Sequence, residues 1–252
     1  MKISIQEMKN LRPIDIYLAV RKRFKISLRG RYFIASRHGA RFIIDINNLV
    51  DRHIEAFGSY EHAQLVKLIS IIKSTGSDIF VDIGANSGMY SIQVAHQIAS
   101  IDIQAFEPDK RNLAQLYGNL FLNGFEDRVK VNHFGISDKN GLASFNRFSD
   151  QNRGRSSVDE RGNFQVELKK LDDAISVIGR RVAIKIDVEG HEAKVIGGSR
   201  RLLSENKCII QIESFDDTPA LDALLLSMGY SRFDSLGNDH YYANYSIDEV
   251  KL

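Results

Sequence analysis

Charged side chains gather in the stretch IKIDVEGHE, which starts as an apolar strand and then breaks at a glycine. Four of them carry groups suited to acid–base or electrostatic catalysis: Lys185, Asp187, Glu189 and His191. A carboxylate or a neutral histidine can take the proton of a substrate hydroxyl. We therefore predict Asp187 or His191 as the general base, with Glu189 positioning the substrate. The alternative, that Lys185 and Asp187 only pair with each other, stays open because buried charges are costly unless paired.

A metal-assisted route is a second alternative that the same carboxylates leave open. Asp187 and Glu189 follow one apolar strand, and Glu213 ends the next strand, CIIQIES. Carboxylate oxygens are ligands that Mg²⁺ prefers, and a bound divalent ion lowers the pKa of a hydroxyl. The candidate metal ligands are thus Asp187, Glu189 and Glu213, on the condition that the three converge.

A glycine-rich turn in FVDIGANSGMYS joins an apolar strand to a helix. Glycines let the backbone approach a ligand closely, and the following helix offers free N–H groups at its positive end. Glu107 ends the next strand, in AFEPD, and a carboxylate there can accept both hydroxyls of a ribose. The pattern predicts an adenosyl-ligand site formed by Asp82, Gly84, Asn86, Ser87, Gly88 and Glu107.

Two kinds of adenosyl cofactor compete for this site. The dinucleotide fingerprint G-x-G-x-x-G is absent, since Asn86 stands at its middle position. No tyrosine is followed four residues later by a lysine, the pair that short-chain sugar dehydrogenases use. Asp82 would repel a pyrophosphate but suits a cation. S-adenosylmethionine carries a sulfonium and an ammonium and no phosphate, so the charges favour it.

The chain after residue 76 has the elements that could position these residues. Apolar strands alternate with helices, as in DIFVDIG, MYSIQVAHQIAS and IDIQAFEPD, and later in RVAIKIDV, HEAKVIGGSRRLLSE and CIIQIES. This alternation predicts an α/β fold with a mostly parallel sheet and helices on both faces. Ligands of such sheets bind beyond the carboxyl ends of the strands, where both motifs fall.

Three further segments complete the expected architecture. RYFIAS and RFIIDI predict an N-terminal hairpin, and YEHAQLVKLISIIKS predicts a helix with one apolar face. The polar segment 139–170 interrupts the alternation, and we expect an inserted hairpin or lid. GYSRFDSLGNDHYYANY predicts an antiparallel pair of edge strands.

Several residues outside these motifs could guide the acceptor to the site, hold it or cover it, although their patterns are less specific. Residues 21–31 hold six cationic side chains in eleven positions, which could steer an anionic acceptor, although a solvated surface is the commoner use of such a run. Arg153 and Arg155, in the inserted segment, could hold an anionic sugar. Tyr60 and Glu61, before the glycine turn, could cover the site.

Composition narrows the class of protein. The 252 residues are 43% hydrophobic and 26% charged, which is ordinary for a globular protein. The net charge of +2 gives no reason to expect nucleic acid as a partner. No run approaches the ~20 apolar residues of a membrane helix. The single cysteine, Cys208, lies in an apolar run and cannot form an internal disulfide. We expect a buried thiol and a cytoplasmic location.

The motifs together resemble the FkbM-type methyltransferases. VDIGANSGMYS, AFEPD, GISDKNG, KKLDD, IKIDVEGHE and IIQIES occur in that family's order, over about residues 55–215. The resemblance implies a seven-stranded Rossmann-like sheet of the class I methyltransferases, S-adenosylmethionine as cofactor and methyl transfer to oxygen. It also implies acceptors such as hydroxyls of sugars or of polyketide-type natural products, and for this chain we expect a hydroxyl of a sugar, glycan or glycosylated natural product. On this basis we divide the chain into an extension, residues 1–55, and a methyltransferase domain, residues 56–252.

The resemblance also assigns residues to the cofactor. It places Pro108 beside the adenine, and it implies that Gly135, Ile136 and Ser137 contact that ring at the end of the third strand. Asp187 would face the reactive end of the cofactor. Residues 1–50 and the chain after 215 match none of the family's motifs.

Two alternatives to a methyltransferase remain open from the sequence. One is an NAD-dependent sugar oxidoreductase, which needs a glycine fingerprint and a Tyr–Lys pair that are missing. The other is a non-catalytic adenosyl-binding module, against which the intact KIDVEGHE stretch argues. The sequence also leaves open the acceptor's identity and a homo-oligomer built through the N-terminal hairpin.

Overall fold

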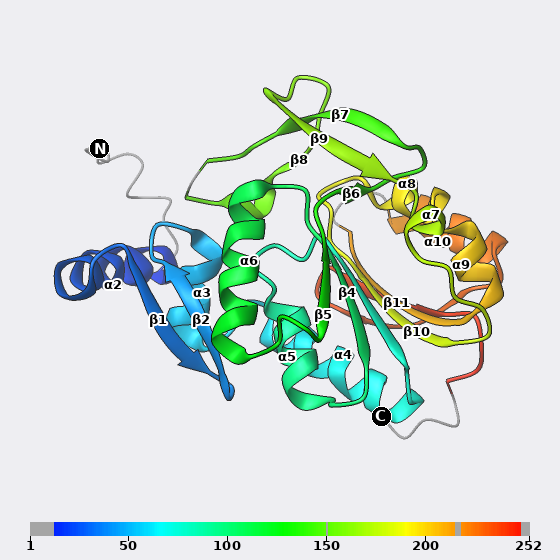
Figure 1. Ribbon diagram of the computed structural model, residues 1–252, viewed down its shortest axis with the longest axis horizontal. Helices are drawn as coiled ribbons and strands as arrows, with labels where there is room; N and C mark the ends of the chain where they lie inside the picture. The colour runs from blue at the N-terminus through cyan, green and yellow to red at the C-terminus, as the bar shows by residue number, and fades with distance from the viewer. Residues whose placement is uncertain (1–12, 150, 215–217, 248–252) are drawn as a thin grey trace.

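The computed structural model describes residues 13–149, 151–214 and 218–247. Its centre is a seven-stranded sheet with the strand order β12-β13-β11-β10-β3-β4-β5 (Figure 1). The parallel strands are β3 (Ile79–Ile83), β4 (Asp102–Phe106), β5 (Val129–Asn132), β10 (Arg181–Ile186) and β11 (Lys207–Glu213). The antiparallel strands are β12 (Ser231–Leu236) and β13 (Asp239–Ala243). Both the mostly parallel sheet and its antiparallel edge pair are confirmed.

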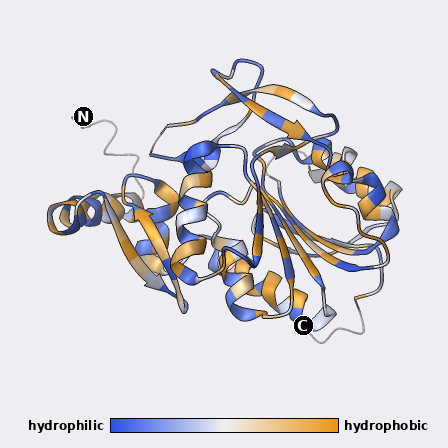
Figure 2. Ribbon diagram, in the orientation of Figure 1, coloured by the Kyte–Doolittle hydropathy of each residue, from blue (hydrophilic) through white to orange (hydrophobic). Residues whose placement is uncertain are grey.

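Helices cover both faces of this sheet, as predicted (Figure 1). One face carries α4 (His62–Thr75), α5 (Met89–Gln97) and α6 (Lys110–Asn123). The other face carries α7 (Leu171–Ala174), α8 (Glu192–Gly197), α9 (Arg200–Glu205) and α10 (Thr218–Ser227). In Figure 2, hydrophobic residues run along the strands between the two helical layers.

Strand β10 contributes to a separate core on each face. Val182, Ile184 and Ile186 belong to the buried cluster beneath α7–α10, whereas Ala183 belongs to the cluster beneath α4–α6. Side chains along a strand alternate between the two faces. Lys185 therefore points to the same side as Ala183, at the carboxyl end of the strand.

The prediction of one continuous helix over HEAKVIGGSRRLLSE is wrong. The chain forms α8, breaks at Gly198 and resumes as α9. A Cβ atom at Gly198 would lie 1.9 Å from the carbonyl oxygen of Ser137, so the backbone passes too close for any side chain. The same approach brings His191, which precedes α8, within 2.9 Å of Ser137 Oγ.

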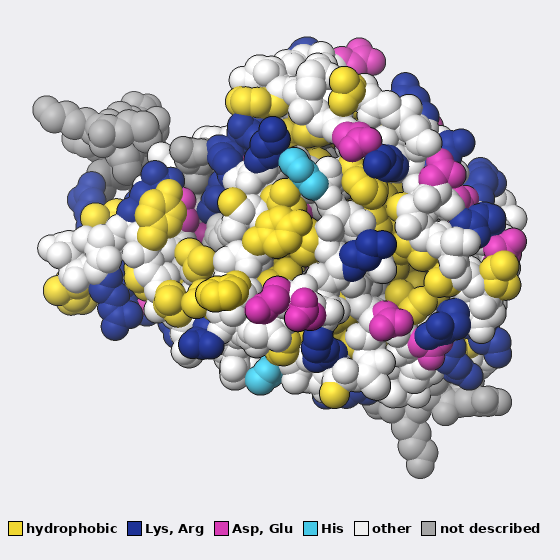
Figure 3. All heavy atoms as spheres, viewed as in Figure 1, with side chains coloured by type: hydrophobic (Ala, Val, Ile, Leu, Met, Phe, Trp, Pro, Cys, Tyr) yellow, Lys and Arg dark blue, Asp and Glu magenta, His cyan; other side chains and the backbone are white. Residues whose placement is uncertain are grey.

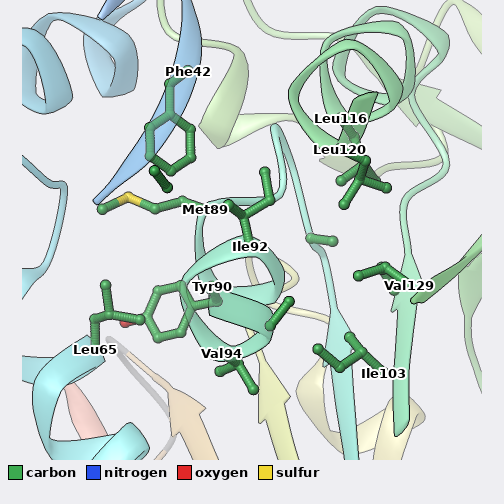
Figure 4. Close-up of a cluster of buried hydrophobic side chains, with 14 of the residues drawn as sticks. Phe42, Leu65, Met89, Tyr90, Ile92, Val94, Ile103, Leu116, Leu120 and Val129 are labelled. Atoms are coloured by element: carbon green, nitrogen blue, oxygen red, sulfur yellow. The ribbon is translucent and has the colours of Figure 1, made fainter. Parts of the chain in front are cut away.

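The N-terminal segment forms two helices and the predicted hairpin. Its elements are α2 (Pro13–Arg29), β1 (Tyr32–Arg37), β2 (Ala40–Asp45) and α3 (Leu49–Phe57). Fully buried Phe42 of β2 lies in one cluster with Met89, Ile92 and Leu116 of α5 and α6 (Figure 4). The division at residues 55 and 56 stays a prediction, and α3 runs across that position.

Side-chain amides of α6 cover the outer edge of β2. Asn119 Oδ1 accepts a hydrogen bond from the Ile43 N–H at 2.7 Å, and Gln115 Nε2 donates to the Ile43 carbonyl at 2.7 Å. Asn123 Oδ1 accepts from the Arg41 N–H at 2.8 Å. Exposed strand edges invite pairing with other chains, so these amides both fix the hairpin and close its edge.

The inserted segment and the two residues Gly135–Ile136 before it form a small sheet over the carboxyl ends of the large one (Figure 1). Its strands, in the order β6-β9-β7-β8, are β6 (Gly135–Ile136), β9 (Phe164–Lys169), β7 (Gly141–Asn146) and β8 (Ser157–Val158). Arg147 fixes this sheet to the start of α6 by two hydrogen bonds, 2.8 and 3.0 Å, to the buried carboxylate of Asp109. The predicted insertion is confirmed, and the Arg147–Asp109 ion pair holds it in place. We call residues 139–170 the roof.

Arg153, in the turn η1 (Arg153–Arg155), connects the inserted segment to the N-terminal segment. Its guanidinium donates to Gln115 Oε1 at 2.8 Å and lies 3.4 Å from the buried Asp51 carboxylate. Burial raises the pKa of Asp51 to about 6. Arg153 and Arg155 both line the cavity described below, so the hypothesis that they hold an anionic sugar stays a prediction; Arg155 is exposed, whereas Arg153 is buried and already paired.

Arg153→Ala is expected to lower the free energy of unfolding by roughly 3 kcal/mol, because it leaves a buried carboxylate without its cation. Arg155→Ala removes an exposed arginine from the same turn and is expected to stay within ~0.5 kcal/mol of the wild type. Urea unfolding of the three proteins measures both values. Equal losses would show that the Arg153 network adds nothing to stability.

Two further observations concern the chain as a whole. Within the described residues, none of the helices has the length and apolar character needed to cross a membrane. Cys208 is fully buried as a free thiol, as predicted, and burial raises its pKa to about 11.

Candidate active site

A cavity of about 760 Å³ lies at the carboxyl ends of β3, β4 and β10. Small-molecule sites commonly enclose roughly 300–1,000 Å³. The small sheet contributes Phe145, Val158 and Leu168 to its lining, while Val50 comes from α3 and Leu221 from α10. Of the residues that the sequence predicts for the site, all except Gly88 and Ser137 line this cavity.

The glycine turn packs directly against the backbone at the end of β10. Gly84 has a φ of +82°, and a Cβ atom there would lie 1.9 Å from the Asp187 carbonyl oxygen. Gly88 has a φ of +84° and packs against Leu116, which explains why it does not reach the cavity. Only glycine combines these dihedral angles with such contacts. The turn therefore sets the position of the Asp187 backbone as well as the shape of the cavity.

Glu107 is held by backbone groups at the end of β4. Its two carboxylate oxygens accept from the Asn86 N–H at 2.8 Å and from the Asp109 N–H at 2.7 Å. Burial raises its pKa to about 7. Oε1 also accepts from Asn112 Nδ2 at 3.5 Å, whereas Oε2 accepts only from the Asn86 N–H among the residues that the structure describes. A carboxylate oxygen can accept two hydrogen bonds, so Oε2 retains acceptor capacity in a residue that lines the cavity.

Asp82 and Asn86 also present acceptors at this end of the cavity. Asp82 Oδ2 accepts from Ser91 Oγ at 2.6 Å, and burial raises the Asp82 pKa. Asp82 Oδ1 and Asn86 Oδ1 are buried and accept no hydrogen bond from any described residue. Buried acceptors without a partner are costly, so this end suits a ligand that brings N–H and O–H donors.

The end lined by Pro108, Gly135 and Ile136 is more apolar. Ser137 lies behind it, with its N–H donating to the Lys169 carbonyl and its Oγ 2.9 Å from His191 Nε2. Burial, reinforced by Lys194, lowers the pKa of His191 to about 4, so this ring is neutral at pH 7. Through this bond His191 is placed to fix Ser137.

Lys185 and Asp187 form an ion pair at the end of β10. Lys185 Nζ lies 2.9 Å from Asp187 Oδ2 and 4.5 Å from the ring centre of Tyr90. The Lys185 side chain is 4% exposed and that of Asp187 is 27% exposed. The pairing that the sequence left open is present, and it leaves Asp187 partly accessible from the cavity.

Three glutamates surround this pair and keep their protons to a higher pH than usual. Burial, together with repulsion from Asp187, raises the pKa of Glu61 to about 7, that of Glu189 to about 7 and that of Glu213 to about 9. A protonated carboxyl group donates as well as accepts. The cavity wall is therefore acidic and rich in hydrogen-bonding groups.

The raised pKa of Glu213 predicts a pH dependence of stability. The folded protein holds the proton of Glu213 more tightly than the unfolded chain does. The resulting contribution to stability is complete below the ordinary pKa of 4.5, and it is lost as the pH rises toward the folded-state pKa of about 9. We expect the Tm to fall from pH 5 to pH 9 and to fall less in Glu213→Gln. Calorimetry over this range measures both slopes. The exposed control Glu160→Gln should keep the wild-type slope, and an unchanged slope in Glu213→Gln would contradict the prediction.

The Mg²⁺ hypothesis is not supported by the geometry. Asp187, Glu189 and Glu213 all line the cavity, but no three Asp, Glu, His or Cys side chains of the described segments are placed to hold a metal ion. Lys185 gives the physical reason, since its ammonium already lies against Asp187 among these acids.

Backbone strain is concentrated around the cavity. Among the described residues other than glycine, those with a left-handed φ are His38, Glu61, Asn86 and Glu189. The last three line the cavity, with φ values of 55°, 53° and 53°. Such conformations persist only where the surroundings enforce them, and they cluster at functional sites.

Sequence reasoning missed Tyr90 and Gln211. Tyr90 places its ring beside Lys185, donates to Glu61 at 3.2 Å and lies 3.4 Å from Gln211 Nε2. Gln211 also donates to Asp239 at 2.6 Å. Tyr90 belongs to the motif VDIGANSGMYS and Gln211 to IIQIES, but neither motif assigned a role to them.

Strand order and the position of the cavity define a Rossmann-like fold of the class I methyltransferases. A solved FkbM methyltransferase from Methylobacillus flagellatus KT matches it with a TM-score of 0.50 and 20% identity. The match covers 66% of this chain and 43% of that structure, and at this identity it shows the fold alone.

The family model of the methyltransferase FkbM domain matches residues 82–232, more than half of the chain. The chain belongs to this family, and methyl transfer is its class of activity. The predicted family, fold class and methyltransferase activity are thereby confirmed.

Two curated relatives agree with this assignment. Methyltransferase sdnD of Sordaria araneosa is 26% identical over 214 residues, which cover 70% of this chain and 83% of that protein. The 2-O-methyltransferase NoeI of Sinorhizobium fredii (strain NBRC 101917 / NGR234) is 28% identical over 168 residues, which cover 59% of this chain and 66% of that protein.

Proposed function

We propose that this protein transfers the methyl group of S-adenosylmethionine to a hydroxyl of a sugar, glycan or glycosylated natural product. The observation that carries the proposal is one cavity lined by neighbouring strand ends: the Lys185–Asp187 pair at the end of β10, the glycine turn after β3 and Glu107 after β4. Asp187 lies directly beside the glycine turn, since a Cβ atom at Gly84 would meet its carbonyl oxygen. A cofactor held by the glycine turn and Glu107 would therefore lie next to an acceptor held around Lys185 and Asp187.

The residues present fit this cofactor. When bound, S-adenosylmethionine supplies an electrophilic methyl group on a sulfonium. Glu107 would accept from the ribose hydroxyls, while the free acceptors Asp82 Oδ1 and Asn86 Oδ1 suit an ammonium and hydroxyls. Pro108, Gly135 and Ile136 would line the adenine. The acids around the cavity favour a cationic cofactor over one with a pyrophosphate.

Asp187 is the proposed general base. Lys185 holds its Oδ2, which fixes the carboxylate and leaves Oδ1 to take the proton of the acceptor hydroxyl. Fixed geometry matters because the oxygen, methyl group and sulfur must lie in line. His191 is less suited, since its Nε2 is engaged with Ser137.

A hydroxyl-rich acceptor fits the part of the cavity around Lys185 and Asp187. Glu61, Glu189 and Glu213 offer donors and acceptors there, and Ser156 and Ser157 add hydroxyls from the roof. NoeI, named as a 2-O-methyltransferase, supports transfer to oxygen. The proposal includes a cytoplasmic location and no nucleic-acid partner.

Calorimetric titration with S-adenosylhomocysteine and, in parallel, NAD⁺ tests the cofactor. We expect micromolar binding of S-adenosylhomocysteine alone, weakened at least tenfold by Glu107→Gln. Binding of NAD⁺ alone would make a sugar oxidoreductase the correct assignment. With the cofactor established, glycan acceptors are screened by the release of S-adenosylhomocysteine.

A further inference from the structure

Helix α2 exposes its apolar residues. Ile16, Val20, Phe24 and Leu28 follow one another at four-residue intervals, so they form a stripe along one side of the helix. They are 47%, 64%, 62% and 64% exposed. A surface helix ordinarily turns such a stripe toward the core. We call these four residues the α2 stripe.

The polar side of α2 is the one that packs against the protein. Arg21 makes two hydrogen bonds, 2.7 and 2.8 Å, to the carboxylate of Glu55 on α3, and Lys25 lies 3.2 Å from the same carboxylate. The Glu55 side chain is 1% exposed. Leu18, on this side, is 3% exposed. These contacts fix the rotation of the helix, so the α2 stripe faces outward.

Two exposed cations of α2 are available to a partner. Arg23 adjoins the α2 stripe and Arg29 lies in the last turn of the helix, and neither makes an ion pair with any residue in the described part of the chain. Lys22 follows Leu18 by four residues and belongs to the packed side. Figure 1 shows α2 at the end of the molecule remote from the large sheet, and Figure 3 shows hydrophobic and cationic side chains together on that end. An apolar stripe with cations beside it is the pattern of a helix that lies in a membrane interface.

Charge distinguishes a lipid surface from a second copy of the chain. A two-fold contact through the α2 stripe would bring the same cations of both copies together. An anionic bilayer would instead meet Arg23 and Arg29 with opposite charge and take up the apolar side chains. We propose that α2 docks this protein on anionic membrane surfaces, with the α2 stripe inserted at the level of the headgroups. This proposal does not rest on the identity of the cofactor or acceptor.

Co-sedimentation of the full chain with vesicles tests the proposal. We expect binding to phosphatidylcholine vesicles containing phosphatidylserine, weaker binding to phosphatidylcholine alone, and a loss on raising the salt concentration. Val20→Ser combined with Phe24→Ser should weaken binding by roughly 100-fold, since burial of each side chain contributes more than a factor of ten. Arg23→Glu with Arg29→Glu should remove the preference for phosphatidylserine.

The matched control is Phe121→Ser combined with Ile178→Ser, which changes residues that are 73% and 70% exposed elsewhere on the surface. It should bind vesicles like the wild type, and an unchanged Tm shows that each variant is folded. Equal binding of the α2 variant and the wild type overturns the proposal, as does equal binding to both vesicle types. A wild-type dimer in sedimentation velocity that Val20→Ser/Phe24→Ser dissociates, without vesicle binding, identifies a second copy as the occupant and also overturns it.

Discussion

Gly84→Ala is expected to lower the free energy of unfolding by roughly 4 kcal/mol and to abolish cofactor binding. Two effects add at this position. A φ of +82° strains any residue with a side chain, and the new methyl group would lie 1.9 Å from the Asp187 carbonyl oxygen. That oxygen belongs to the backbone and cannot turn away. The turn or the end of β10 must shift, and both line the cavity. Urea unfolding and calorimetry with S-adenosylhomocysteine measure the two losses.

Gly76→Ala separates the clash from the strain. Gly76 ends α4 with a φ of +61°, and a Cβ atom there has no neighbour within 4 Å. It should lose only about 1 kcal/mol, the cost of the left-handed conformation alone, and bind the ligand normally. Similar losses in both variants would mean that the contact with Asp187 does not constrain the turn.

The sequence was sufficient for the fold because its signals are local. RVAIKIDV was recognisable as a strand from its run of apolar residues, and the period of two of a strand then places Val182 and Ile184 on one face and Ala183 and Lys185 on the other. The glycine turn and Glu107 were placed at neighbouring strand ends by the topology of parallel sheets alone. The helix over HEAKVIGGSRRLLSE failed because the break depends on a contact between Gly198 and Ser137, which are distant in sequence.

The polar networks could not be predicted for the same reason. Arg153 appeared as a ligand-binding residue in a loop, yet it pairs with Asp51, 102 positions earlier. Tyr90 lies beside Lys185 only once β3 and β10 are neighbours. The α2 stripe was concealed because the cations of residues 21–31 dominated the pattern, and periodicity does not say which side of a helix is covered. Such features require the packing of whole elements.

Asp187→Asn is expected to reduce kcat by a factor on the order of 10²–10⁴, the usual contribution of a general base. Asparagine keeps the size of the side chain and can still accept from Lys185 Nζ, but it cannot take a proton. Binding of S-adenosylhomocysteine should change less than about threefold. Release of S-adenosylhomocysteine with a glycan acceptor that the wild type methylates measures turnover, and the Tm tests whether the buried Lys185 tolerates the lost charge.

Two variants show whether the effect belongs to Asp187. Glu192→Gln removes a nearby carboxylate whose Oε1 accepts from the Gly190 N–H at 2.9 Å, and it should retain most of kcat. His191→Ala removes the ring that bonds Ser137, so it should weaken cofactor binding more than it lowers kcat. Full turnover in Asp187→Asn together with loss of turnover in His191→Ala would identify His191 as the general base. Lys185 and Asp187 would then be a structural pair at the end of β10. Burying either charge alone is costly, so their pairing alone could explain why both are present.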